Sequence, residues 1–336
     1  MSGVRAEAQL ALPGVAVEEA NEVEWVWTED PLEGSVQEEF AHITVMLGEV
    51  RDAVVPDASA TGVYVDATLG GGGHTRALLE KAPGVRVIAF DRDDVALAAA
   101  RKSLEGFGDR VTFVKTTFAR IREALTNLGI TKVDGLCADL GVSSPQLDEA
   151  SRGMSFRREG PIDMRMDQSD GETALDLIER LTDEELADVI FRYGDERRSR
   201  RIARSVKRAF TEGQLLTTLD LRRAVVRAVG PQRVGGVDPA TRTFQALRIK
   251  VNEELVELEE LLAALPTVLE EGAVASILSF HSHEDRLVKR AFATADFSPL
   301  TKKPTMASEA ECAENPRSRS AKLRSARFSP AEKEPA

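Results

Sequence analysis

Short apolar runs alternate with amphipathic stretches in the first half of the chain. Runs rich in valine, isoleucine and leucine predict strands at 63–65, 85–90, 111–114 and 133–138. The stretches between them carry apolar residues at helical spacing and predict helices at 75–81, 95–104 and 121–128. Strands that alternate with helices in this way predict a parallel sheet with right-handed crossovers.

The pattern changes after Pro145, where apolar positions recur only at helical spacing. A capping box at Thr182 and Glu185 starts one predicted helix, and two others follow at 202–210 and 217–229. One long amphipathic helix is then expected at 244–262, followed by a further strand at 274–280.

These elements predict an α/β, Rossmann-like fold with a mostly parallel sheet and an inserted all-helical domain. The α/β domain is expected to be discontinuous, formed by residues 41–146 and 240–336, with the helical insertion at 147–239. A length of 336 residues suits about two domains of ordinary size.

Composition excludes a membrane-spanning protein. Charged residues make up 30% of the chain, and no apolar run approaches the roughly 18 residues that a membrane helix needs. The N-terminal stretch lacks the pattern of a secretory signal, so we expect a cytoplasmic protein without a membrane partner. Cys137 and Cys312 lie far apart in the sequence and are expected to be free thiols.

The net charge of −12 is unevenly distributed. Residues 1–40 contain ten acidic residues and one basic residue, which predicts an acidic and mostly disordered extension; a docked strand or partner motif around Trp25 and Trp27 is the alternative. Residues 192–208 carry eight basic residues against two acidic ones, and the tail at 317–327 is also basic. Such local patches leave a nucleic-acid partner open.

A glycine cluster follows the first predicted strand. Asp66 precedes Gly70–Gly73, and a helix is expected to start there, so free backbone N–H groups can meet a ligand. Asp91 ends the next strand, where a carboxylate can accept both ribose hydroxyls. The cluster lacks the G-x-G-x-x-G pattern of NAD sites and fits S-adenosylmethionine better. A tight turn without a ligand is the alternative.

A second polar segment runs from Asp139 to Gln146, at the carboxyl end of the fourth predicted strand, where doubly wound sheets bind ligands. Enzymes that methylate amino groups place hydrogen-bond acceptors there. An exocyclic amine needs that help, because its lone pair is delocalised into the ring. A simple strand-to-loop turn is the alternative.

Two further features lie near the C-terminal half of the fold. The predicted long helix carries a polar stripe opposite its leucines, and we expect this stripe to face a cleft. It consists of Thr241, Gln245, Arg248 and Asn252. The segment around His281 invites a metal interpretation, but the chain has only four histidines, so we predict no metal. His281 is expected to line the cleft at a strand end.

Long motifs resemble the bacterial RsmH (MraW) family over about residues 41–328. They begin at residues 42, 70, 90, 139, 152, 160, 240, 279 and 314, and read HITV, GGGGH, FDRD, DLGVSSPQLD, RGMSF, GPIDMRMD, ATRTFQALRI, SFHS and ENPRSRS. The resemblance implies a class I methyltransferase that uses S-adenosylmethionine to methylate N4 of a cytosine in the decoding region of 16S ribosomal RNA. It also makes a homodimer plausible.

Carried over by position, the resemblance implies a set of cofactor-binding residues: Gly72, Gly73, His74, Asp91, Phe118, Asp139 and Gln146. It assigns RNA recognition to the helical insertion. For the amine we expect Asp139 with Ser143 or Ser144, and transfer without a covalent enzyme intermediate. The remaining candidates to lie near the substrate are Asp163, Arg165, Asp167, Gln245, Arg248, Asn252 and His281.

Two other classes of function stay open from the sequence. A non-catalytic ribosome-assembly or RNA-binding factor could keep the fold for docking alone. A methyltransferase that acts on DNA or a small molecule would share the cofactor motifs, although the basic insertion disfavours a small substrate.

Overall fold

The computed structural model describes residues 44–231 and 237–331. The acidic extension expected at 1–40 lies outside them. Within these ranges, no helix is long and apolar enough to cross a membrane.

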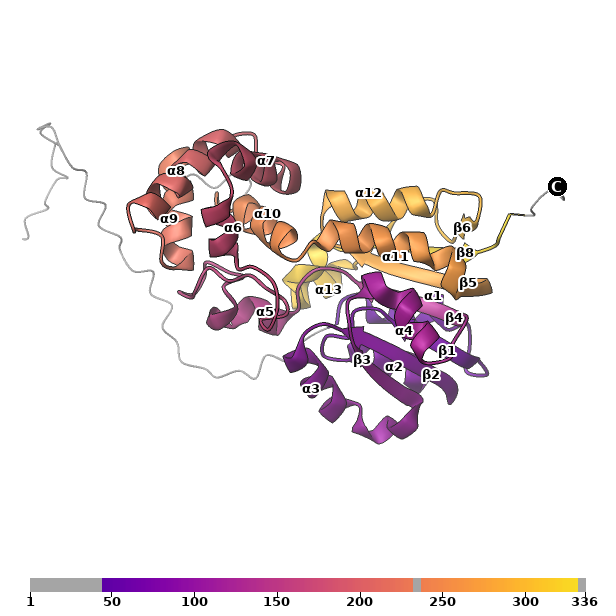
Figure 1. Cartoon of the computed structure of the whole chain (residues 1–336). Helices are drawn as coiled ribbons and strands as arrows, with labels where there is room; N and C mark the ends of the chain where they lie inside the picture. The colour runs from indigo at the N-terminus through magenta and orange to yellow at the C-terminus, as the bar shows by residue number, and fades with distance from the viewer. Residues whose placement is uncertain (1–43, 232–236, 332–336) are drawn as a thin grey trace, which may run out of the picture. The chain divides into compact units, whose positions relative to one another are not determined.

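The described residues form an eight-stranded sheet, which confirms the predicted α/β fold (Figure 1). Its main path runs β3 (Val111–Lys115), β2 (Gly84–Asp91), β1 (Thr61–Asp66), β4 (Val133–Asp139), β5 (Leu269–Ser279), β8 (Lys322–Phe328) and β6 (Phe297–Pro299), and β7 (Thr305–Met306) pairs with β8. The first five strands are parallel, whereas β8 is antiparallel to β5. Because β1 and β4 are neighbours, the order reverses there and opens a crevice at their carboxyl ends.

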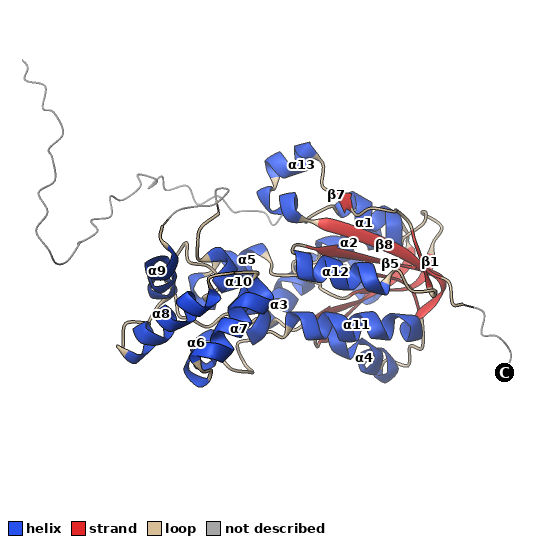
Figure 2. Ribbon diagram, turned by 90° about the horizontal axis from the view of Figure 1, so that it is seen from above, coloured by secondary structure: helices blue, strands red, loops and turns tan. Residues whose placement is uncertain are grey.

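Helices cover both faces of the sheet. Successive residues of each strand point to opposite sides, and apolar residues on both sides pack against helices. Tyr64 of β1 packs in one apolar cluster and Val65 in another. The Tyr64 cluster includes residues of α1 (Leu47–Val54), α2 (Gly73–Lys81) and α3 (Asp94–Ser103). The Val65 cluster includes residues of α4 (Ile121–Asn127), α11 (Glu254–Val268) and α12 (Ser282–Ala291) (Figure 2).

A separate apolar cluster holds the helical part together. It draws on α6 (Ala174–Arg180), α7 (Asp183–Gly194), α8 (Ser199–Thr211), α9 (Thr218–Val229) and α10 (Thr241–Val251). The capping box predicted at Thr182 and Glu185 is confirmed, and α6 and α9 begin with boxes of the same kind. The boundaries expected for the insertion stay a prediction.

The single long helix expected at 244–262 is wrong. The chain forms α10 and α11 instead, with Glu253 between them in the left-handed region at φ 51°. The amide of Asn252 donates to the carbonyl of Met164 and accepts from the backbone N–H of Met166. These contacts to a distant loop stabilise a break that the local apolar spacing does not indicate.

Candidate functional site

A cavity opens at the carboxyl ends of β1, β2 and β4, on the crevice where the strand order reverses. The predicted residues that line it are Gly73, His74, Asp91, Phe118, Asp139, Ser143 and Gln146. The structure therefore brings together residues from four separate stretches of the sequence. Gly72 lies just outside this wall as the N-cap residue of α2.

The glycines set the shape of the loop that enters α2. Gly72 has φ 84°, a left-handed conformation that favours glycine. A Cβ on Gly73 would lie 1.9 Å from Oγ1 of Thr44, which also lines the cavity. Gly73 thus lets the segment at Thr44 close on the loop.

We expect the Gly73→Ala substitution to weaken cofactor binding at least about tenfold, because the new methyl group collides with Thr44. All three nearest atoms belong to the Thr44 side chain, so the second change Thr44→Gly should restore much of the affinity. Calorimetric titration with S-adenosylhomocysteine measures both effects. The control is Gly48→Ala in α1, where a Cβ meets nothing within 4 Å. Unchanged affinity in Gly73→Ala would contradict the assignment.

Asp91 fixes the loop and still has acceptor capacity. Its Oδ2 accepts from the backbone N–H of Gly70 at 2.8 Å, and its Oδ1 accepts from that of Asp93 at 2.9 Å. A carboxylate offers about four lone-pair positions, so further hydrogen bonds from a ligand are possible. These two hydrogen bonds lower the pKa of Asp91, but burial outweighs them and raises the pKa above its usual value.

The most unusual polar group of the cavity is the pair formed by His74 and Asp139. Asp139 Oδ2 lies 3.7 Å from His74 Nε2, and the backbone N–H of Asp139 donates to Thr68 Oγ1 at 2.6 Å. Within the described residues, both ring nitrogens of His74 and Oδ1 of Asp139 are buried without a hydrogen-bond partner. Burial lowers the pKa of His74, but Asp139 and Asp66 together outweigh it and raise the pKa overall. Unpaired buried polar atoms are typical of a site that a ligand completes.

Gln146 connects the cavity wall to a buried ion pair. Its Oε1 accepts from the backbone N–H of Ser143 at 3.0 Å, and its Nε2 donates to Asp93 Oδ2 at 2.8 Å. The same oxygen of Asp93 pairs with Arg152. Ser144 begins the short helix α5 (Ser144–Asp148), and its side chain lies outside the described part of the structure.

Three predicted substrate residues lie on the loop after α5 and do not line the cavity. Asp163 and Arg165 form a bidentate ion pair, and Asp167 lies 3.6 Å from Lys115. Met166 lines the cavity instead. The substrate roles of Asp163, Arg165 and Asp167 stay predictions.

Two residues of the polar stripe on α10, Arg248 and the C-cap Asn252, are occupied by contacts within the protein. Arg248 donates to both carboxylate oxygens of Glu254, at 2.7 and 2.8 Å, and Asn252 holds the Met164–Met166 backbone. Glu254 lines the cavity, whereas Gln245, Arg248 and Asn252 are absent from its described wall. Of the stripe, Arg248 is therefore connected to the cavity by its ion pair with Glu254.

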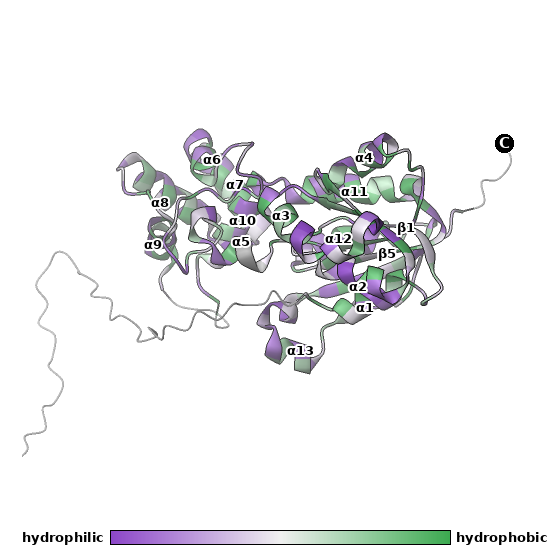
Figure 3. Ribbon diagram, turned by 90° about the horizontal axis from the view of Figure 1, so that it is seen from below, coloured by the Kyte–Doolittle hydropathy of each residue, from purple (hydrophilic) through white to green (hydrophobic). Residues whose placement is uncertain are grey.

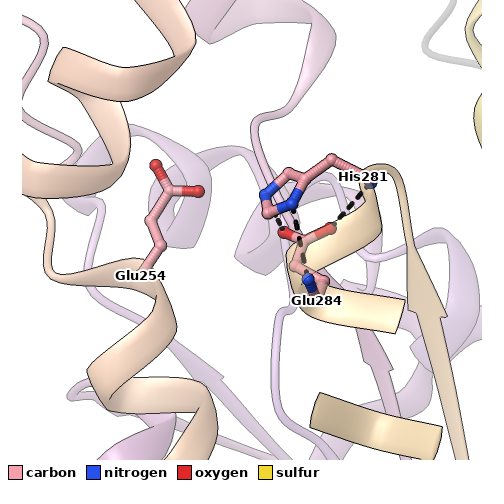
Figure 4. A group of neighbouring side chains, drawn as sticks. All are labelled: Glu254, His281 and Glu284. Atoms are coloured by element: carbon pink, nitrogen blue, oxygen red, sulfur yellow. Dashed lines mark hydrogen bonds and ion pairs between the residues drawn. The ribbon is translucent and has the colours of Figure 1, made fainter. Parts of the chain in front are cut away.

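His281, expected to line the cleft, is absent from the described cavity wall and is the N-cap residue of α12. Potential ligand atoms of His281, Glu254 and Glu284 lie within 4.8 Å of one another (Figure 4). However, Glu254 is held by Arg248, and Glu284 accepts from the backbone N–H groups of Phe280 and His281. These partners compete with a cation, and the absence of a metal stays a prediction.

Several wall residues are not among the predicted site residues. Phe280, Glu254, Glu257 and Arg317 line the cavity from elements that follow the helical region. Glu257 forms an ion pair with Arg92, yet burial raises its pKa to about 7. The motifs SFHS and ENPRSRS contain Phe280 and Arg317 and could have indicated these two residues. Glu254 and Glu257 belong to no such motif, and only the packing of distant segments brings them to the site.

Comparison with known proteins shows that the chain matches one methylase family and is similar to proteins named as ribosomal RNA methyltransferases. The profile of the MraW methylase family matches residues 39–329. A "Ribosomal RNA small subunit methyltransferase H" of Sorangium cellulosum (strain So ce56) is 62% identical over 287 residues, which are 85% of this chain and 90% of the relative. The protein of the same name from Synechococcus sp. (strain CC9902) is 50% identical over 296 residues, 86% of this chain and 97% of the relative.

Proposed function

We propose that this chain, which belongs to the MraW methylase family, transfers a methyl group from S-adenosylmethionine to N4 of a cytosine in the decoding region of 16S ribosomal RNA. Family membership confirms the resemblance found in the motifs. The names of the relatives support small-subunit RNA as the substrate. The observation that carries methyl transfer is the contact between His74 and Asp139 in the cavity wall, where both ring nitrogens of His74 and Oδ1 of Asp139 are buried without a hydrogen-bond partner among the described residues.

The cavity fits S-adenosylmethionine. The cradle at Gly73 would be filled by any side chain, and the acceptors of Asp91 lie at the end of β2. Gly73, His74, Asp91, Phe118 and Gln146 would hold the cofactor, with Asp91 at the ribose and Phe118 beside the adenine. When bound, the cofactor supplies an electrophilic methyl group on a sulfonium centre.

Asp139 is the group that we place at the amine. Its unpaired Oδ1 can accept a hydrogen bond from the amino group of the target base. This hydrogen bond orients the amine nitrogen and increases its electron density. Cys137, two residues earlier on β4, is buried, and burial raises the pKa of its thiol well above the usual value. This supports transfer without a covalent bond to the enzyme, because a reactive cysteine needs its thiolate.

We place RNA recognition on the helical region, and specifically on α8. Arg200, Arg201, Arg204 and Arg208 are exposed and have no partner within the described residues, whereas Ile202 and Val206 of the same helix are buried. At 3.6 residues per turn these arginines share one face, which extends about 12 Å along the axis. Figure 3 shows the two-sided character of α8. A row of unpaired arginines suits the phosphates of RNA.

Removing three of these arginines should weaken binding of small ribosomal subunits and reduce its salt dependence. For Arg200→Ala, Arg204→Ala and Arg208→Ala together, we expect the slope of log K against log salt to fall by about 2 to 3. A control with the same charge change replaces Lys289, Arg290 and Lys302, which are exposed and lie outside the helical region. Equal effects of the two triple variants would contradict a specific RNA surface.

Transfer of label from S-adenosylmethionine to small subunits tests the function. Subunits from cells that lack this gene should accept the label, and duplex DNA should not. Preferred labelling of DNA would favour the alternative substrate. Cofactor-independent binding of subunits without any transfer would favour an assembly factor.

A further inference from the structure

Arg317, an arginine of the cavity wall, is not among the residues that we place at the cofactor or at the amine. Arg317 comes from the short 3-10 helix Pro316–Ser320, which follows α13 (Glu309–Glu314). Its backbone N–H donates to Asn315 Oδ1, and the fully buried Ser318 donates to the carbonyl of Asn315 at 2.8 Å. These contacts fix the segment at the cavity wall, where Arg317 and Asn315 both line it.

The guanidinium of Arg317 is only partly used. Nη2 donates to the two carboxylate oxygens of Asp148, at 3.2 and 3.1 Å. Nη1 is buried and has no hydrogen-bond partner among the described residues. A guanidinium carries five N–H donors, and leaving a charged donor buried and unpaired is unfavourable. Arg317 therefore has capacity for an anionic ligand.

The position of Arg317 indicates where that ligand lies. Its side chain is 36% exposed and that of Asp148 is 52% exposed, so the pair lies at the rim of the cavity. Asp148 is the last residue of α5, the helix that follows Asp139 in the sequence. We place the target cytosine at Asp139. The other wall arginine, Arg92, is already paired with Glu257.

We infer that Arg317 binds a backbone phosphate of the target nucleotide while its base occupies the cavity, an inference that rests on the proposed function. A base that is turned into an enclosed pocket leaves its phosphates at the pocket mouth. Hydrogen bonds from a guanidinium to a phosphate are charge-assisted, and here the unpaired Nη1 can donate them. Such contacts fix the register of the RNA without reading its sequence. Arg317 is then a positioning residue for the base that faces Asp139.

The test compares two ligands that differ only in phosphates. With S-adenosylhomocysteine saturating, calorimetry measures the Kd of cytidine and of cytidine 3′,5′-bisphosphate. We expect the unaltered protein to bind the bisphosphate at least about tenfold more tightly. In Arg317→Ala this preference should nearly vanish while the Kd of cytidine stays unchanged. Arg319→Ala, an exposed neighbour that does not line the cavity, should keep the preference.

The same variants separate phosphate from the other anion that enters the site, the carboxylate of the cofactor. We expect the Kd of S-adenosylhomocysteine to stay within about twofold in Arg317→Ala. A tenfold loss would overturn the inference and assign Arg317 to the cofactor. Retained preference in Arg317→Ala, or equal or undetectable binding of both ligands by the unaltered protein, would also overturn it. These are binding measurements, so a failure of methyl transfer to small subunits would count against the proposed function alone.

Discussion

Replacing Asp139 by asparagine is expected to lower kcat for methyl transfer at least about 100-fold. The substitution keeps the size of the side chain and the backbone hydrogen bond to Thr68 Oγ1, but it removes the negative charge beside His74. The amine then loses an anionic acceptor, and the positive charge that develops on the nitrogen is no longer stabilised. Single-turnover transfer to small subunits measures the chemical step.

Cofactor affinity distinguishes this role from a structural one. The Kd of S-adenosylhomocysteine should change by less than about threefold in Asp139→Asn, because the cradle at Gly73 and the Asp91 carboxylate remain. Asp188→Asn, on an exposed position of α7, is the matched control and should behave as the unaltered protein. A rate within a few-fold of the unaltered protein in Asp139→Asn would show that the acceptor lies elsewhere.

The second large effect is expected on stability, for Arg152→Ala. Arg152 and Asp93 are 3% and 4% exposed and form an ion pair between the segment after β2 and the loop that follows α5. Arg152 Nη2 also donates to the carbonyl of Met166 at 2.7 Å. Removing one partner of a buried pair leaves an uncompensated charge, so the free energy of unfolding should fall by about 3 to 5 kcal/mol.

Denaturant unfolding checks this value against an exposed pair. Arg180 and Glu172 are 57% and 36% exposed, and Arg180→Ala should lower the free energy of unfolding by less than about 1 kcal/mol. Similar losses in the two variants would mean that the buried Asp93–Arg152 pair stabilises the fold no more than an exposed pair does.

The parts of the fold that the sequence predicts are those encoded by neighbouring residues. Strand-ending aspartates such as Asp91 and Asp139, and the loop at Gly73, follow from short apolar runs and turn chemistry, and they lie in one cavity. Ser143 and Gln146 are predicted from the polar segment that begins at Asp139. The sequence could not assign their contacts, because Asp93 and Arg152 come from other segments.

The C-terminal tail shows why the remainder could not be predicted. Its basic residues suggest a nucleic-acid patch, yet residues 322–328 form β8 beside β5. Arg324 and Lys322 pair with Asp285 of α12, and Arg327 donates to the carbonyl of Gly272. These long-range partners occupy the three side chains in contacts within the protein, and the pattern along the tail gives no sign of them. Arg317, in contrast, keeps an unpaired nitrogen at the cavity.

The decisive measurement for the proposed function identifies the methylated atom. Small subunits from cells that lack this gene are incubated with the protein and labelled S-adenosylmethionine, and the nucleosides of their RNA are separated by mass spectrometry. We expect label in N4-methylcytidine at one decoding-region site, and none with Asp139→Asn. Label on another atom or in another class of RNA, or no label despite measurable cofactor binding, would contradict it.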